Sequence, residues 1–150
     1  MKLLDKLRFS ILIKSITINK IDSLSGVEFE NFLCDFFNYI GFKASTTSVT
    51  GDNGIDILAK SGHNSIGIQT KLYYNHNVGN KAVQEVFSGK NFFQLNHAIV
   101  VTNSKFSQPA ITLANQLKVG LIDRNTLNLM LTSSKKENRI LIKNIIREIS

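Results

Sequence analysis

Three polar side chains in the middle of the sequence, Asp56, Gln69 and Lys71, have types and spacing suited to holding a divalent metal ion. Gln69 and Lys71 are two residues apart in a predicted strand over residues 65–71, so both project from the same face of a sheet. Asp56 lies on the preceding predicted strand, over residues 55–60, and pairing of the two strands brings it beside them. The sequence therefore predicts one cluster that contains a carboxylate, an amide and an ammonium group.

The oxygen atoms of this cluster are those that a hard cation prefers. The side chains of Asp56 and Gln69 and the backbone carbonyl of Thr70 suit Mg²⁺, and Mn²⁺ accepts the same donors. Lys71 adds a positively charged hydrogen-bond donor next to the metal. Such a set can orient and acidify a water molecule and neutralise charge on a phosphate group in a transition state.

The same residues also permit a purely structural interpretation. The Gln-x-Lys pattern occurs a second time, at residues 116–118, where a predicted helix makes the two side chains diverge. Asp56 can be an acid at the end of a turn that pairs with a nearby lysine, and Gln69 and Lys71 can belong to a polar sheet face. The strand setting, and an acid one hairpin upstream, distinguish the first pattern from the second.

A helix over residues 25–40 is predicted upstream of the cluster. Ser25 and Glu28 form a capping-box pattern at its start, and Gly41 has the position of a C′ residue at its end. Glu30 lies at the shoulder of the apolar stripe of this helix, from which its carboxylate can point into a cleft at the edge of the core. The stripe consists of Val27, Phe29, Phe32, Leu33, Phe36, Phe37 and Ile40.

Alternation and turn residues predict the remaining elements. Residues 42–49, 55–60 and 65–71 are expected to form an antiparallel meander, with Ile55 on the same face as Ile57. Further elements follow along the chain: a helix over 80–93, a strand over 97–102, a helix capped by Ser107, a strand over 119–122 and helices over 124–131 and 136–149. A strand–helix–strand unit of this length implies a parallel, right-handed crossover, so we predict an α/β fold with a mixed central sheet flanked by helices.

The composition is that of one globular domain. The chain has 150 residues, of which 43% are hydrophobic and one is proline, and this excludes disordered, collagen-like and Pro-rich classes. The single cysteine, Cys34, excludes an internal disulfide, argues against a cysteine-based zinc site and predicts a reducing, cytoplasmic location. Charges interrupt every apolar run at the N-terminus, so neither a signal peptide nor a spanning helix is expected. Residues 2–19 are instead predicted to form a helix with one stripe that consists of Leu3, Leu4, Leu7, Ile11 and Ser15.

The net charge of +7 is concentrated at the two ends of the chain. Residues 1–20 carry five basic residues and one acid, residues 135–150 carry five basic residues and two acids, and the segment between them is neutral. These charges are either solvated faces of two peripheral helices or surfaces that attract a polyanion, such as nucleic acid or an anionic membrane face.

Several motifs together resemble those of the Mrr-type restriction endonuclease family. The resemblance extends over about residues 22–131 and leaves out the basic termini. The matching stretches are Gly51–Asp56, Ile68–Lys71, Phe29-Glu30 in a helix that ends at Gly41-Phe42, Val101–Ser107 with Ala110, and Leu121–Asp123.

The resemblance implies the αβββαβ core of the PD-(D/E)xK nucleases, in the branch with Gln in place of an acidic residue. It implies metal-dependent hydrolysis of DNA phosphodiester bonds by in-line attack of water. It assigns Asp56 and Gln69 to metal binding and Lys71 to water activation or charge stabilisation, and Glu30 matches a first-helix acid that helps to hold the metal. Gln69 removes one negative charge, so metal affinity is expected to be lower. Asp52 resembles another family residue, although a turn role suffices for it.

We divide the chain into a basic N-terminal helical arm (1–20), an Mrr-like nuclease domain (21–132) and a basic C-terminal helix (133–150). The leading hypothesis is a Mg²⁺-dependent endodeoxyribonuclease in restriction or phage defence, or one that resembles a Holliday-junction resolvase. The alternatives are a non-catalytic nucleic-acid-binding module on a nuclease fold and, more weakly, a membrane-surface role for the first helix. DNA is the expected partner, with no small-molecule substrate and no membrane, and a two-strand cut favours a homodimer through the isoleucine face of residues 136–149.

The remaining aromatic and histidine residues near the cluster receive structural interpretations. Tyr73 and Tyr74 follow the strand that carries Lys71 and either cap the sheet edge, which we favour, or stack on a base. His63, His76 and His97 lack metal-ligand spacing and are interpreted as surface or satisfied histidines.

Overall fold

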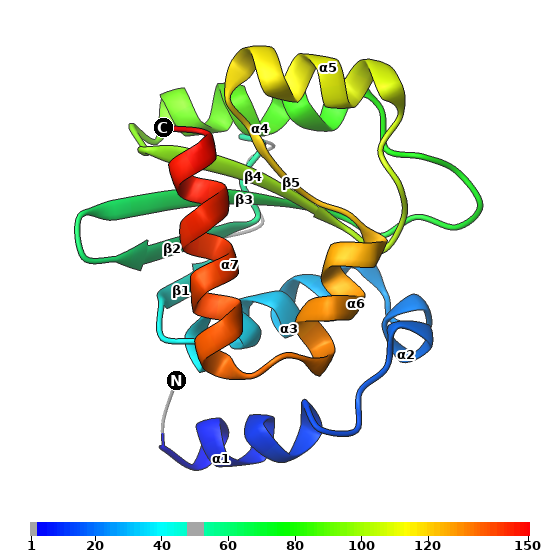
Figure 1. Ribbon diagram of the computed structural model, residues 1–150, viewed down its shortest axis with the longest axis vertical. Coiled ribbons are helices and arrows are strands. Elements are labelled where there is room, and N and C mark those ends of the chain that lie inside the picture. Colours follow the sequence, from blue (N-terminus) through cyan, green and yellow to red (C-terminus); the bar gives the residue numbers. More distant parts are fainter. Residues whose placement is uncertain (1–2, 48–52) are drawn as a thin grey trace.

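A five-stranded mixed sheet lies at the centre of the protein (Figure 1). The structure is a computed structural model and describes residues 3–47 and 53–150. The strands are neighbours in chain order: β1 (Lys43–Thr46), β2 (Ile57–Ser61), β3 (Asn64–Lys71), β4 (His97–Thr102) and β5 (Gly120–Ile122). β1, β2 and β3 pair antiparallel, and β3, β4 and β5 pair parallel. The predicted antiparallel meander and the parallel pairing that follows it are therefore confirmed.

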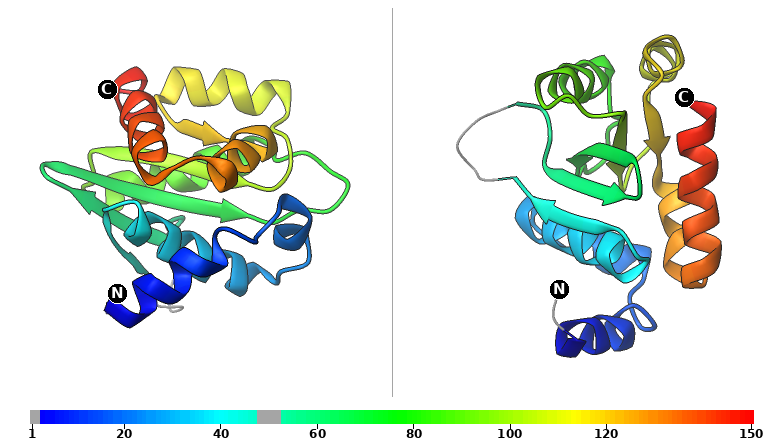
Figure 2. Two further views of the ribbon diagram at one scale, coloured as in Figure 1. Left: turned by 60° about the horizontal axis from the view of Figure 1, so that its bottom comes forward. Right: turned by 90° about the vertical axis from the view of Figure 1, so that its left-hand side faces the viewer.

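Helices cover both faces of the sheet (Figure 2). Those on one face are α4 (Asn80–Phe92) and α5 (Gln108–Leu117), and those on the other are α3 (Gly26–Tyr39), α6 (Arg124–Thr132) and α7 (Lys135–Glu148). Two further helices, α1 (Leu3–Leu12) and α2 (Ile18–Asp22), precede α3. The α/β class with a mixed sheet flanked by helices is as predicted. Among the described residues, no helix is long and apolar enough to cross a membrane.

The ends of α3 follow the predicted capping signals. The Ser25 hydroxyl accepts a hydrogen bond from the Glu28 N–H, and the Glu28 carboxylate accepts one from the Ser25 N–H, which completes the capping box. Gly41 has a φ of +103°, and the Phe42 N–H donates to the carbonyl of Phe37, as in a Schellman motif. These two caps fix where α3 begins and ends, and therefore which turn of the helix presents Glu30 to the sheet.

The single helix predicted over residues 2–19 is wrong. α1 ends at Leu12, and Thr17 caps the start of α2 by accepting a hydrogen bond from the Lys20 N–H. The apolar stripe of α1 is also not the one that is buried. Leu4, Leu7 and Ile11 of the predicted stripe are exposed, while the side chains of Phe9 and Ile13 are buried. The ring of Phe9 packs between the rings of Phe32 and Tyr39 on α3, which decides the orientation of α1.

The predicted strands 42–49 and 55–60 are shorter in the structure. β1 ends at Thr46, and residues 48 and 49 lie outside the described part of the chain, as does the turn over residues 50–52. β2 begins at Ile57, so Asp56 precedes the strand rather than lying within it. Ile55 is buried in the core beneath α4 and α5, whereas Ile57 is buried beneath α3. The two side chains therefore do not share a face, because the backbone changes direction at Asp56.

The isoleucine face of α7 does not form an external contact surface. Ile142 and Ile146 are buried in the same core as α3, and Ile145 packs against it. The hypothesis that this face mediates a homodimer is therefore wrong, because the protein's own core already covers it.

Two glycines hold the loop before Asp56 against α4. Gly54 has a φ of +71°, and a Cβ atom at this position would lie 2.0 Å from the Glu85 carbonyl oxygen. A Cβ atom on Gly89, one turn further along α4, would lie 2.2 Å from the carbonyl oxygen of Asn53. Because backbone meets backbone at both points, the loop and the helix fit together only when these positions lack side chains.

We expect Gly54→Ala to lower the free energy of unfolding by about 3 kcal/mol, since a left-handed conformation and overpacking against α4 both oppose the new methyl group. Gly62→Ala is the matched control, because Gly62 also has a positive φ (+59°) but has nothing within 4 Å of the new Cβ. It should cost only about 1 kcal/mol. Urea denaturation measures both changes, and equal losses would contradict the close contact at Gly54.

Candidate active site at the ends of β2 and β3

The carboxylate of Asp56 lies where β2 and β3 separate and accepts three hydrogen bonds. Its Oδ2 atom is 2.6 Å from the backbone nitrogen of Thr70, 3.0 Å from the Thr70 hydroxyl and 2.8 Å from the side-chain nitrogen of Gln69. The pairing of Ile57 with Ile68 would place Thr70 opposite Ile55 in a regular ladder. The Thr70 N–H bonds to the Asp56 side chain instead, and this fixes the position of the carboxylate.

Gln69 carries a buried oxygen atom without a hydrogen-bond donor. Its side chain is 7% exposed, and Oε1 has no partner among the described residues. An unsatisfied buried polar atom costs about 1–3 kcal/mol. Rotation of the amide would place this oxygen beside Asp56, where two oxygen atoms repel each other unless a cation lies between them. The orphaned oxygen is therefore what a cation-binding amide would present.

Glu30 approaches Asp56 from the other side of the site. It is partly buried on α3, and it forms no hydrogen bond or ion pair with any described residue. Burial raises the pKa of its carboxyl group above the ordinary value, and the negative charge of Asp56 raises it further. Two carboxylates that repel each other in the absence of a counter-ion are an arrangement that a bound cation stabilises.

Lys71 projects from the same face of β3 as Gln69, toward α4. Its ammonium nitrogen is 2.9 Å from Oε2 of Glu85, and the other carboxylate oxygen of Glu85 is 3.7 Å from Lys81. Glu85 escaped the sequence analysis, because its contact with Lys71 spans 14 residues and leaves no local pattern. The only signal was its spacing of four residues from Lys81 on a predicted helix.

The four predicted side chains can be described by what each contributes to the site. Asp56, Gln69 and Glu30 supply oxygen atoms, and Lys71 supplies a positive charge held by Glu85. Thr70 uses its N–H and hydroxyl to hold Asp56, and its carbonyl remains a predicted ligand. No group of three or more His, Cys, Asp or Glu residues suited to a metal occurs in the described ranges. With two carboxylates and an amide, the donor set still fits a hard cation, of lower affinity than an all-acidic set would give.

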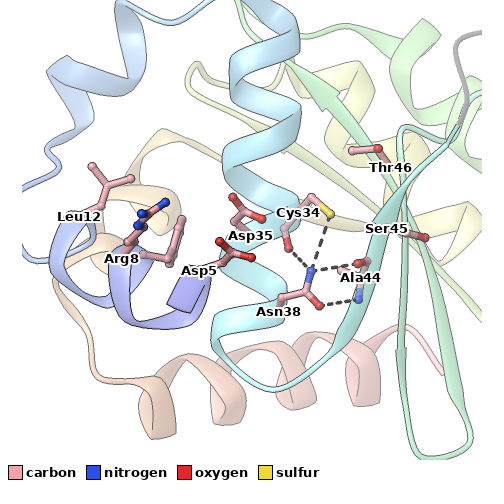
Figure 3. Close-up of a pocket in the computed structure, with 10 residues that line it drawn as sticks. Asp5, Arg8, Leu12, Cys34, Asp35, Asn38, Ala44, Ser45 and Thr46 are labelled. Carbon is pink, nitrogen blue, oxygen red and sulfur yellow. Dashed lines mark hydrogen bonds between the residues drawn. The ribbon is translucent and has the colours of Figure 1, made fainter. Parts of the chain in front are cut away.

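A separate cavity lies between α1, α3 and β1 (Figure 3). It has a volume of about 670 Å³ and is lined by Arg8, Cys34, Asp35 and Asn38, among others. Burial raises the pKa of Cys34 and of Asp35, so neither group is activated for nucleophilic chemistry. The Asn38 amide is occupied by the backbone of Cys34 and Ala44. We assign this cavity no catalytic role.

Comparison with known proteins identifies the family. The family model of the Mrr catalytic domain, described as a restriction endonuclease, matches residues 21–131. The chain belongs to this restriction endonuclease family. None of the curated proteins matches the chain.

Solved structures of restriction endonucleases share the fold. The DNA modification-dependent restriction endonuclease AspBHI has a TM-score of 0.61 at 14% identity, and MspJI in complex with a 27-mer oligonucleotide has a TM-score of 0.53 at 16% identity. The match covers 97% and 95% of this chain but only 40% and 35% of those two proteins. AF1548, a protein of unknown function, has a TM-score of 0.57 at 16% identity, with 79% of each chain covered.

We expect Glu30→Gln to raise the free energy of unfolding in metal-free buffer at pH 7, by about 0.2–1 kcal/mol. The native pKa of Glu30 is raised, so the wild type loses stability as the pH rises from the ordinary value of 4.5 through the native pKa. The difference between the two proteins should therefore vanish at low pH. Adding Mg²⁺ should stabilise the wild type more than the variant in thermal melts. A variant that is no more stable than the wild type at pH 7 would argue against the repulsion.

Proposed function

We propose that this member of the restriction endonuclease family is a metal-dependent endonuclease that hydrolyses DNA phosphodiester bonds. The observation that carries the proposal is the pairing of an anchored Asp56 carboxylate with a buried, unpartnered oxygen on Gln69. A protein gains nothing in stability from that oxygen, so a ligand is its best explanation. Glu30 adds a second carboxylate whose repulsion from Asp56 a cation would relieve.

The residues that would hold Mg²⁺, or Mn²⁺, are Asp56, Gln69 and Glu30, with the carbonyl of Thr70. A bound Mg²⁺ ion supplies Lewis-acid stabilisation of charge on the phosphate and lowers the pKa of a water molecule. Asp56 cannot easily turn away from this position, because Thr70 holds it by two hydrogen bonds. The protein therefore positions its charge before the substrate arrives, which is the condition for electrostatic catalysis.

Lys71 supplies the positive charge of the site. Glu85 holds the ammonium group at 2.9 Å, so the lysine side chain is oriented rather than free in solvent. From this position Lys71 donates a hydrogen bond to a phosphate oxygen, or to the attacking water, while negative charge develops on the phosphate. Water attacks phosphorus in line with the leaving oxygen and gives up a proton to solvent, while the bond to the leaving oxygen breaks and that oxygen takes a proton from solvent.

DNA is the proposed substrate because the family is one of restriction endonucleases and the solved relative MspJI is bound to an oligonucleotide. Basic side chains at both ends of the chain favour binding to a polyanion. The chain matches only about a third of the length of MspJI, so restriction or phage defence, a cytoplasmic location, and a homodimer that cuts both strands are further parts of the proposal. The division into a basic arm (1–20), a nuclease domain (21–132) and a basic helix (133–150) also stays a proposal.

A non-catalytic nucleic-acid-binding module is the second candidate function. The observation that favours it is Gln69, an uncharged residue where an acid would strengthen metal binding, together with the lack of a three-acid cluster among the described residues. Such a module would bind DNA in a salt-sensitive manner and leave it uncut with any metal.

We expect Lys71→Met and Asp56→Asn each to lower the rate of plasmid cleavage by about 10²-fold or more. The first removes positive charge beside the phosphate, and the second removes the negative charge that would hold the metal. The assay measures, by gel electrophoresis, how fast supercoiled plasmid is converted to nicked and linear forms in the presence of Mg²⁺ or Mn²⁺. The control variant is Lys118→Met, from the second Gln-x-Lys pattern, where the lysine lies between α5 and the edge strand β5 and donates to the carbonyl of Ser150. It should cleave at the wild-type rate. Binding without cleavage by the wild type, in either metal, would support the second candidate instead.

A further inference from the structure

Two aromatic side chains stack on each other directly after the strand that carries Lys71. The ring centroids of Tyr73 and His76 are 4.1 Å apart, and the ring planes are inclined by 31°. His76 is exposed, and it contacts no other ring of the described residues. The ring face of His76 that points away from Tyr73 is therefore available to a ligand.

The stacked pair adjoins the candidate active site. Gln69 and Lys71 face α4 from β3, and Tyr73 packs against the apolar core beneath α4 and α5, on the same side of the sheet. Two residues of extended chain span about 6–7 Å. A nucleic acid strand with a phosphate at Lys71 would therefore pass the Tyr73–His76 pair with its next nucleotides.

A hydrogen-bond network centred on the buried side chain of Asn103 holds the backbone of Tyr73 in place. The Asn103 side chain accepts a hydrogen bond from the Tyr73 N–H at 2.8 Å and donates one to the Tyr73 carbonyl at 3.1 Å. Asn103 is 2% exposed and donates also to Asp22, which is held by two hydrogen bonds from the Arg124 guanidinium. The hydrogen bond from Arg124 keeps the pKa of Asp22 below its ordinary value. These bonds fix the backbone of Tyr73, and the packing of its side chain against the core beneath α4 and α5 places the ring.

His76 is fixed by its own contacts. Nδ1 lies 2.7 Å from the carbonyl oxygen of Tyr74 and, since a carbonyl only accepts, Nδ1 carries the hydrogen. The carbonyl of His76 accepts a hydrogen bond from the Ser104 hydroxyl at 2.7 Å. Nε2 forms no hydrogen bond with the described residues, so the edge of the ring can bond to a ligand that stacks on its face.

An open cavity of about 390 Å³ surrounds the pair. Lys105 contributes positive charge to its lining, Arg124 and Asp22 line it as an ion pair, and Tyr74 contributes a further ring. The volume falls in the range of about 300–1,000 Å³ in which small ligands bind. Aromatic faces beside positive charge suit a nucleotide, whose base stacks and whose phosphate is an anion.

We propose that Tyr73 and His76 form a stacking site for an unpaired base next to the phosphodiester bond that is cut. A base inside a duplex has neighbours on both faces, so only an unpaired or displaced base offers a face to His76. The substrate class is therefore DNA with a gap, flap or mismatch beside the cut. The inference rests on the proposed endonuclease function and assigns its substrate.

The test measures DNA binding by Asp56→Asn protein, which is expected to bind without cutting. Fluorescence anisotropy compares a fully paired duplex with the same duplex containing a short unpaired stretch. We expect about tenfold tighter binding to the second DNA, since each stacked base contributes strongly to affinity. Adding His76→Ala should abolish this preference and leave binding to the paired duplex unchanged. His76→Phe, which retains a ring, should restore most of the preference.

His63→Ala is the matched control, because His63 is also exposed but lies in the turn between β2 and β3 at the opposite end of β3. It should leave the preference intact. Equal binding to both DNAs, or an equal loss for both in His76→Ala, would overturn the stacking site while plasmid cleavage by the wild type still upheld the endonuclease. Absence of DNA binding together with absence of cleavage by the wild type would overturn both.

Discussion

At the point where β2 and β3 separate, the carboxylate of Asp56 accepts the hydrogen bond that a backbone carbonyl would accept in a regular sheet. The candidate site depends on this hydrogen bond. Thr70 would otherwise bond to Ile55 across the sheet, but its N–H donates to Asp56. The Ile55 carbonyl is satisfied separately by the Thr47 hydroxyl. The strands can therefore separate without leaving these groups unpaired, and the opening between them receives a negative charge. A side chain that terminates a ladder is held more firmly than one that merely projects from a strand.

Neighbouring charges in the site are balanced in two different ways. Lys71 has a partner in Glu85, so the lysine charge is satisfied within the protein. Asp56 is satisfied by neutral donors, and Glu30 has no partner among the described residues, so the acidic side of the site carries an uncompensated charge. The repulsion between the Glu30 and Asp56 carboxylates is therefore not offset by a positive side chain of the described residues, whereas the charge of Lys71 is offset by Glu85. The site thus carries a negative charge at Glu30 on α3 that no described residue pairs, and a paired positive charge at Lys71 next to α4.

Local signals in the sequence predicted much of this arrangement. The caps of α3 depend on residues three apart, and the order of strands and helices follows from short periodicities, so both could be inferred without a partner surface. The face on which Gln69 and Lys71 lie follows from strand geometry alone. The bend at Asp56 could not be inferred from strand geometry. It arises from the fit of Gly54 against α4, and no local sequence pattern contains that contact.

Features that depend on distant surfaces could not be predicted. Phe9 rather than Leu7 turns inward on α1 because rings of α3 receive it, and both residues are apolar in the sequence. Glu85 meets Lys71 only after α4 has docked on the sheet. The orphaned oxygen of Gln69 is a property of burial, and the identity of the residue gives no sign of it.

The backbone contact of the Asn53–Gly54 loop with α4 also links the two charged halves of the site mechanically. Asp56 follows this loop by two residues, and Glu85 belongs to the helix against which the loop rests. Because this contact joins main-chain atoms, the separation between the Asp56 carboxylate and Glu85 is set by the backbone and does not depend on a side chain at the contact.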